Sequence, residues 1–332
     1  MRPELEALAG AQGGIFTRHQ ALANGYAKKE FDRLSSARGG PWLRVRYGVY
    51  VTRELWDELA DLERHMLGDR SALLVCDRGT VLSHSSAARR HGFDLYDITD
   101  ELTHVTRFRT HGRKINRVES GIKHHCGRLD ETEIETLHDV PVTSPLRTVM
   151  DMANEYGYRT GLVTADSALR AGSFKTELVK LSERLSNSSS APTLRAVAMD
   201  SDGRSESALE TLARVLLRRI GVADVEPQVV VRSPELGDLR VDLFAHGLRH
   251  VFECDGKLKY QDQTDERGRR ISARDVVWRE KRREDEIRGQ GFGVSRITWP
   301  DVVTPNVDRV SARLWREIRQ QNASGLYTSA SA

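Results

Sequence analysis

The segment FECDGKLKY, residues 252–260, carries charged side chains at every second position: Glu253, Asp255 and Lys257. If this segment is a β-strand, alternate side chains point to the same face, so the three charged groups stand in one row. Proteins bury charged groups only where these have a partner or a function. The row therefore constrains the fold. The strand must end at a place where two carboxylates and an ammonium either have partners of opposite charge or take part in a function.

A helix is predicted before this row. In SESALETLARVLLRRIG (205–221), Ser207 and Glu210 occupy the positions of a capping box. Glu206 lies three residues before Leu209 and extends the apolar stripe, so its carboxylate is expected to point at whatever the helix packs on. The stripe is formed by Leu209, Leu212, Ala213, Leu216, Leu217 and Ile220.

A hairpin is predicted between the helix and the charged row. Its strands are EPQVVV (226–231) and LRVDLFA (239–245), and the turn at 246–247 leads back into the row. Asp242 takes the face opposite to Val241 and Leu243, which places it beside the row. The sequence thus predicts that four acids converge, with Lys257 at the rim: Glu206, Asp242, Glu253 and Asp255.

Such a cluster of carboxylates would repel itself and shift its own pKa values. A divalent cation that prefers oxygen ligands, such as Mg²⁺, Mn²⁺ or Ca²⁺, removes the repulsion. Such an ion activates water and neutralises a phosphoryl transition state, while a lysine orients the nucleophile or stabilises charge. The pattern therefore favours phosphodiester hydrolysis. The alternative is that Glu253, Asp255 and Lys257 are solvated strand-end charges balanced by nearby arginines.

The order of helix Glu, strand Asp and strand Glu-x-Asp resembles the PD-(D/E)XK nuclease superfamily, specifically the branch of the very-short-patch-repair endonucleases. WREKRREDEIRGQGFGVSRITWPDV (278–302) is similar to the closing helix and strand of that branch, and the resemblance covers about residues 200–320. It implies catalysis by Glu206, Asp242, Glu253, Asp255 and Lys257, with Mg²⁺ or Mn²⁺ held by Asp242, Glu253 and Asp255.

This resemblance leaves the strand motif open, because Asp255 stands where the wider superfamily has its lysine. Either Glu253-Cys254-Asp255 is the working motif, or Asp255-Gly256-Lys257 is a literal Asp-x-Lys. In the closing helix, candidates for contacts with phosphates are Arg279, Lys281, Arg282 and Arg283, although for most of them a solvated charged face is an equal alternative.

The first 53 residues hold nine Lys and Arg against four Asp and Glu, and this basic excess is compatible with a polyanionic partner. Three short helices are predicted, the second capped by Thr17, and WLRVRYGVYV then alternates as a strand pair. This is the layout of a winged helix-turn-helix, whose third helix can enter the major groove of DNA. The alternative is a small helical domain for protein contact. The expected DNA contacts are Lys28, Lys29, Arg33, Arg44 and Arg46.

Residues 1–53, with the element RYGVY, resemble the winged-helix domain of the AbiEi-type antitoxins, which are transcriptional autoregulators of type IV toxin–antitoxin systems. LSHSSAARRHGF (82–93) and VPVTSPLRTVMDMA (140–153) are similar to the region that accompanies this domain. The resemblance covers about residues 1–175. It implies double-stranded DNA as a partner, and it suggests a cognate toxin as a second one.

The histidines of the middle region are not expected to be functional. His84 lies among serines, but no Gly-x-Ser-x-Gly elbow surrounds them, and the segment that follows has the pattern of a capped helix. KHHCGR (123–128) offers His124, His125 and Cys126. Adjacent strand residues point to opposite faces, so no metal site is expected there.

A chain of 332 residues is long for one domain, and the composition break SNSSSAP (186–192) indicates a linker. We expect an α/β protein, α+β overall, with a C-terminal mixed sheet flanked by helices. The expected parts are a winged helix-turn-helix (1–55), a middle α+β region (56–185), a linker (186–204), a nuclease domain (205–320) and a disordered tail (321–332).

Neither a signal peptide nor a membrane-spanning run is recognisable, so a cytoplasmic protein is expected, without a membrane partner or a small-molecule cofactor. The expected function is that of a metal-dependent DNA endonuclease or nickase in restriction or phage defence. The alternative is a non-catalytic DNA-binding autoregulator or antitoxin, and a nuclease acting on RNA is a third possibility.

Overall fold

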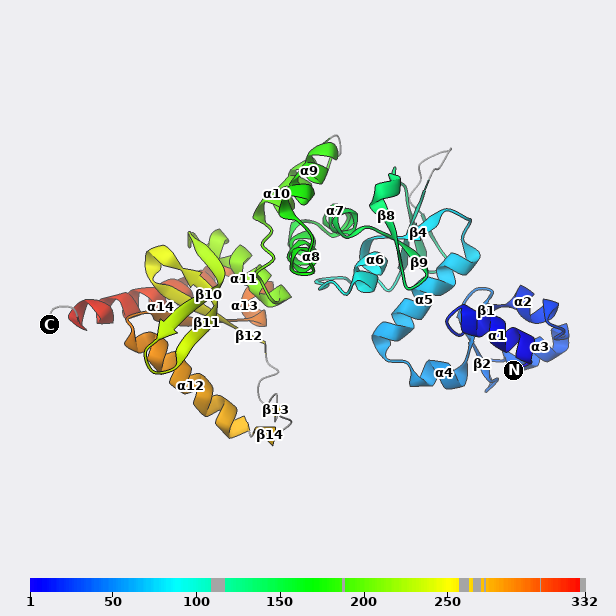
Figure 1. Ribbon diagram of the computed structural model, residues 1–332, viewed down its shortest axis with the longest axis horizontal. Coiled ribbons are helices and arrows are strands. Elements are labelled where there is room, and N and C mark those ends of the chain that lie inside the picture. The colour runs from blue at the N-terminus through cyan, green and yellow to red at the C-terminus, as the bar shows by residue number, and fades with distance from the viewer. Residues whose placement is uncertain are drawn as a thin grey trace. The chain divides into compact units, whose positions relative to one another are not determined.

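The computed structural model describes residues 1–108, 117–186, 189–256, 263–264, 270–271, 273–304 and 306–328. The chain divides into two compact units. The first contains residues 1–168 and 172–201, and the second contains residues 169–171 and 202–332. Each unit combines helices with β-sheet, as Figure 1 shows, so the expected α+β class is confirmed.

The first unit begins with three helices and a hairpin, as the sequence predicted, and adds a short strand that the sequence analysis missed. The predicted cap is confirmed, because the side chain of Thr17 accepts from the backbone N–H of Gln20. The three strands pair in the order β1-β3-β2 around an aromatic core that includes Phe16, Phe31 and Trp42. The elements are α1 (Pro3–Ala11), β1 (Ile15–Thr17), α2 (Arg18–Ala23), α3 (Lys28–Leu34), β2 (Trp42–Arg46) and β3 (Val49–Thr52).

A six-stranded mixed sheet forms the middle of the first unit, in the order β6-β7-β5-β4-β9-β8. Strands β5 and β7 run parallel, with Thr106 opposite His125. The elements are α4 (Arg53–Glu58), α5 (Asp61–Val75), β4 (Thr80–Leu82), α6 (His84–His91), β5 (Thr103–Arg107), β6 (Arg117–Glu119), β7 (Ile122–His125), η1 (Glu131–Glu133), β8 (Ile134–Leu137) and β9 (Val140–Thr143).

Four helices complete the first unit, and the last of them lies in the predicted linker. This helix, α10, buries Leu194, Val197 and Ala198 in a core shared with the other three, so this part of 186–204 is packed structure. Its apolar face was obscured in the sequence by the serine-rich run before it. The helices are α7 (Pro145–Tyr156), α8 (Tyr158–Arg170), α9 (Lys175–Arg184) and α10 (Ala191–Asp200); the last residues of α8 belong to the second unit.

The second unit contains a four-stranded sheet in the order β10-β11-β12-β15, with antiparallel pairs up to β12 and a parallel pair between β12 and β15. Leu239, Val241 and Leu243 alternate as buried residues along β11, as predicted. Helix α12 packs against the sheet through Ile287. The elements of this sheet and its first flanking helices are α11 (Ala208–Arg219), β10 (Val225–Ser233), β11 (Gly237–Ala245), η2 (His246–Leu248), β12 (His250–Asp255), α12 (Ala273–Gly289) and β15 (Gly293–Thr298).

The remaining elements of the second unit are a small strand pair and two C-terminal helices. Because α14 continues to Thr328, residues 321–328 of the expected disordered tail are helical, and 329–332 lie outside the described residues. Over the described parts of the chain, no helix combines the length and the apolar character needed to cross a bilayer. These elements are β13 (Gln263–Thr264), β14 (Arg270–Ile271), α13 (Trp299–Val303) and α14 (Val307–Thr328).

Candidate functional site

Asp242 on β11 is fixed to the neighbouring strand. Its Oδ2 accepts a hydrogen bond from the backbone N–H of Cys254 at 2.7 Å. The ladder between β11 and β12 pairs Leu243 with Phe252, and one further step of that register would put Asp242 opposite Glu253. The predicted neighbourhood of the hairpin acid and the charged strand is therefore present.

The two acids at the end of β12 each face an arginine. Arg283 of α12 lies 3.1 Å from Oε1 of Glu253 and also donates to the carbonyl of Arg240. Arg296 of β15 lies 3.3 Å from Oδ2 of Asp255. The other oxygen of Asp255, Oδ1, is buried and accepts no hydrogen bond from the described part of the chain. Arginine balance, the alternative considered from the sequence, thus applies to both residues in this structure.

A cavity of about 20 Å³ lies between these acids and α12. That volume is enough for a single water or a bare ion. Four carboxylates and two guanidiniums line it, so the formal charge of its wall is negative by two. The charged lining residues are Glu253, Asp255, Glu280, Glu284, Arg283 and Arg296.

Glu206 does not have the position predicted for it. It precedes the N-cap of α11, is exposed, and forms an ion pair with Arg240 at 2.9 Å. Glu210 is the buried acid of this helix instead. Its carboxylate accepts from the hydroxyl of Ser207, from the backbone N–H of Glu206 and from the amide of Gln228.

The surroundings of Glu210 raise its pKa. Burial raises the pKa of Glu210, and the negative charge of Asp242 raises it further. This helix acid therefore lies close enough to Asp242 for their charges to interact. A sequence signal was present, because Glu210 shares a helical stripe with Ala213 and Leu217 at spacings of three and seven residues.

The predicted acids do not form a preassembled metal site. Among the described residues, they do not bring three ligand oxygens within 4.8 Å of one another. The donor types and the buried, unbonded oxygen of Asp255 nevertheless suit a hard divalent cation. Lys257, the last residue of the predicted row, lies outside the described residues.

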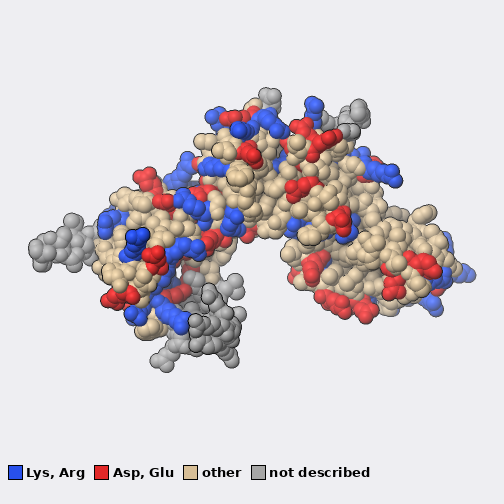
Figure 2. All heavy atoms as spheres, in the orientation of Figure 1, with Lys and Arg blue, Asp and Glu red and all other residues tan. Residues whose placement is uncertain are grey.

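Most of the predicted DNA contacts are exposed, whereas one of them is hydrogen-bonded inside the protein. Lys28, Lys29 and Arg33 are exposed on α3, and Arg44 is exposed on β2. Figure 2 shows basic side chains projecting from the edge of the molecule where α2 and α3 lie. On α12 of the second unit, Lys281 and Arg282 are also exposed, in agreement with the expected solvent-facing helix surface.

Arg46 differs from the other predicted contacts because its guanidinium points into the first unit. It donates to the hydroxyl of Ser71 at 2.6 Å, to the carbonyl of Gly68 at 2.8 Å and to the hydroxyl of Thr103 at 2.9 Å. Burial lowers the pKa of Arg46. Its side chain thus connects β2 with α5 and β5, which is a structural use that the sequence analysis did not foresee.

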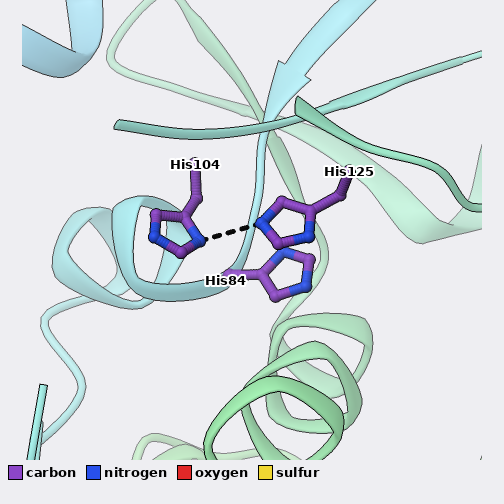
Figure 3. Close-up of side chains that lie close together, drawn as sticks. All are labelled: His84, His104 and His125. Carbon is purple, nitrogen blue, oxygen red and sulfur yellow. Dashed lines mark hydrogen bonds between the residues drawn. The ribbon is translucent and has the colours of Figure 1, made fainter. Parts of the chain in front are cut away.

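A second group of candidate metal-binding side chains was not brought together in the sequence analysis. His84 at the start of α6, His104 on β5 and His125 on β7 meet in the first unit, and all three are buried. Nε2 of His125 is hydrogen-bonded to Nδ1 of His104 at 2.9 Å, and the ring of His84 is stacked on that of His125. Figure 3 shows the three side chains together. The three histidines could bind a metal ion, because one ligand atom from each lies within 4.8 Å of the other two.

The pKa values of all three histidines are lowered. Burial is the main cause in each case. It lowers the pKa of His84 well below its usual range, lowers that of His104, and lowers that of His125 to about 3. His125 was considered from the sequence only with its chain neighbours, whereas its spatial partners lie about twenty and forty residues away.

In comparisons with known proteins, the sequence matches no protein-family model and no curated protein.

Proposed function

We propose that the protein is a metal-dependent endonuclease or nickase that acts on double-stranded DNA. The observation that carries this proposal is the cavity at the end of β12, with its four carboxylates and two guanidiniums. Cys254, whose N–H is bound by Asp242, also lines this cavity. An excess of negative charge around a space for one small ion is what a divalent-cation site requires.

The order of elements supports the same proposal. A helix, three antiparallel strands, a second helix and a strand parallel to the third follow one another as α11-β10-β11-β12-α12-β15. The PD-(D/E)XK resemblance implies such a mixed sheet flanked by helices, with its acids on the second and third strands. Asp242 is on β11, and Glu253 and Asp255 are on β12.

In this proposal Asp242, Glu253 and Asp255 hold a Mg²⁺ or Mn²⁺ ion. When bound, the ion supplies activation of water and neutralisation of phosphate charge. Arg283 and Arg296 balance the two strand acids in its absence. Glu210, whose pKa is raised, replaces Glu206 as the acid of the first helix. Lys281 and Arg282, both exposed on α12, are candidates for phosphate contacts.

The N-terminal helices and hairpin would dock the protein on DNA. Lys28, Lys29 and Arg33 share the exposed side of α3, the helix that corresponds to the reader of a winged helix-turn-helix. Arg44 on the hairpin adds a further exposed cation. Restriction or phage defence in the cytoplasm is the setting that this combination of DNA docking and cleavage suggests.

The experiment is incubation of the full chain with supercoiled plasmid in Mg²⁺, Mn²⁺ or EDTA. Nicked or linear product in either metal, and none in EDTA, is expected. The Asp242→Asn variant serves as the control for a contaminating nuclease. Product that persists in EDTA, or that the variant forms equally well, would contradict the proposal. A parallel RNA substrate distinguishes the two nucleic acids.

A non-catalytic autoregulator or antitoxin is the second candidate, and one observation favours it. Glu253 and Asp255 each form an ion pair with an arginine, as expected for a sheet kept only for binding. In that case the chain binds its own promoter and pairs with a toxin, while plasmid stays intact in every metal. Specific promoter binding together with intact plasmid would support this candidate.

A further inference from the structure

We infer that His84, His104 and His125 form a binding site for a transition-metal ion such as Zn²⁺, separate from the proposed nuclease centre. The three side chains come from α6, β5 and β7 of the first unit, and their ligand nitrogens lie within 4.8 Å of one another. The whole cluster lies within a single unit, which the chain forms between residues 1 and 201.

Oxygen atoms surround the cluster and lie at hydrogen-bond distance from ring nitrogens of His104 and His84. Nε2 of His104 is 2.9 Å from a carboxylate oxygen of Asp100 and 3.2 Å from the hydroxyl of Tyr156. Nδ1 of His84 is 2.9 Å from the hydroxyl of Ser83. This is the outer layer that metal-binding histidines have, where an oxygen partner fixes the tautomer and orientation of each ring.

The inward nitrogens remain available for an ion. They are Nδ1 of His104 and Nε2 of His125, which share a hydrogen bond of 2.9 Å, and one ring nitrogen of His84. This hydrogen bond involves only His104 and His125. On the far side of His125, Nδ1 lies 3.9 Å from a carboxylate oxygen of Glu155. His104 and His125 thus each have one nitrogen directed to an oxygen and one that an ion can take.

The backbone of His84 has a positive φ, as do seven other residues besides glycine in the described parts of the chain. Its φ is 50°, in the left-handed region that residues other than glycine seldom adopt. The ring of His84 lies 3.5 Å from that of His125, at an interplanar angle of 15°. An ion bound between the rings would replace the hydrogen bond between His104 and His125.

The donor set selects the class of ion. Neutral imidazole suits Zn²⁺, Co²⁺, Ni²⁺ and Cu²⁺, whereas Mg²⁺ and Ca²⁺ prefer oxygen. Three protein ligands leave a fourth position, which a tetrahedral ion fills with water or another small ligand. The residues His84, His104 and His125 are 4%, 0% and 7% exposed, so uptake requires a local opening of the first unit and is expected to be slow.

The test uses the full chain without a polyhistidine tag, with excess Mg²⁺ present to fill the oxygen site. Wild type is incubated with Co²⁺, and the bound metal is measured after gel filtration together with the visible absorption spectrum. One Co²⁺ per chain, a visible band of nitrogen-bound cobalt and a raised melting temperature are expected. The His104→Gln, His125→Gln double variant should bind none, and Asp100→Asn should bind about 10- to 100-fold more weakly.

Two matched controls separate this site from others. His65→Gln removes an exposed histidine of α5, and Asp242→Asn removes the acid of the proposed nuclease centre; both should bind Co²⁺ as wild type does. Folded wild type that binds no Co²⁺, or binding retained by the double variant, would overturn the inference. Loss of binding in Asp242→Asn would do so too. If the double variant fails to fold, two other measurements test the inference: the number of Co²⁺ ions bound per wild-type chain, and the affinity of the Asp100→Asn variant for Co²⁺.

Discussion

The carboxylate of Asp242 on β11 accepts a hydrogen bond of 2.7 Å from the backbone N–H of Cys254 on β12. A side chain of one strand is thus bonded to the backbone of the neighbouring strand. The regular pairing between β11 and β12 is recorded up to Leu243 and Phe252. The position of Asp242 relative to Glu253 is therefore set by a backbone contact and does not depend on a bound ion.

Asp242→Asn tests the proposed centre directly. The side-chain oxygen of asparagine still accepts from Cys254, so the variant should fold and keep binding DNA. It should lose metal-dependent cleavage by several orders of magnitude, on the scale seen when a catalytic group is removed from a hydrolytic site.

The melting temperature of Asp242→Asn without metal should equal or exceed that of wild type, because a charge that raises the pKa of Glu210 is gone. Mg²⁺ should raise the melting temperature of wild type more than that of the variant. Undiminished cleavage would favour the regulator.

The motif on β12 is resolved by comparing Glu253→Ala with Lys257→Ala. If Glu253-Cys254-Asp255 is the motif, Glu253→Ala should be inactive and Lys257→Ala should retain activity. The opposite result would identify Asp255-Gly256-Lys257. We expect the first outcome, because Glu253 and Asp255 both line the cavity at the strand end. Plasmid nicking at equal protein concentration measures both, and full activity in each variant would remove this strand from the centre.

Features that depend on neighbouring residues were predictable from the sequence. The cap at Thr17 and the alternation of Leu239, Val241 and Leu243 follow from spacings of two to four residues, and both are confirmed. Glu206 and Glu210 could not be separated in this way, because each lies near the apolar stripe of the same helix. The contact of Glu210 with Gln228 on β10 decides between them, and it depends on how the helix docks.

Features that depend on distant pairing were not predictable. His84, His104 and His125 are separated by about twenty residues each, and they meet because β5 and β7 run parallel beside α6. The same applies to Arg46, whose partners Gly68 and Thr103 follow it by 22 and 57 residues. An arginine on a strand gives no local indication of whether it faces solvent or a neighbouring helix.

DNA binding by α3 is tested with Lys29→Ala, Arg33→Ala in the Asp242→Asn background, which prevents cleavage. Both cations are exposed, so their removal should weaken duplex binding and make its affinity less dependent on salt, because fewer counterions are released. Lys180→Ala, Arg195→Ala removes two exposed cations from α9 and α10 and should bind as the parent does. Fluorescence anisotropy over a salt series measures both. Equal effects of the two pairs would argue against a specific surface on α3.

Arg46 and Arg44 provide a matched pair on one strand. Arg46→Ala removes four hydrogen bonds from a guanidinium and should lower the free energy of unfolding by roughly 2–3 kcal/mol. Arg44 is exposed, so Arg44→Ala should change stability by less than about 0.5 kcal/mol while weakening DNA binding. Urea denaturation and anisotropy separate these effects. A stable Arg46→Ala variant with weakened DNA binding would restore Arg46 as a DNA contact.

His250 makes the stability of the second unit dependent on pH. This side chain on β12 is fully buried, with Nε2 at 2.9 Å from the hydroxyl of Ser295, and burial is the main cause that lowers its pKa to about 4. The unfolded chain has the ordinary value of about 6.5, so below that pH it binds a proton that the folded chain does not. Stability is therefore complete above about pH 6.5 and falls by up to about 1.4 kcal/mol for each pH unit down to the folded pKa.

The variant His250→Gln isolates this effect. Glutamine can keep the hydrogen bond to Ser295 but does not titrate, so the variant should lose less stability than wild type between pH 7.5 and 5. The difference in that loss should be about 2 kcal/mol, and the comparison cancels the contribution of the acids that both proteins share. Ser295→Ala, which leaves the imidazole in place, should keep the steep pH dependence of wild type. Urea denaturation at the two pH values measures all three proteins. Parallel pH profiles of wild type and His250→Gln would show that the histidine is protonated in the folded state, against the burial seen here.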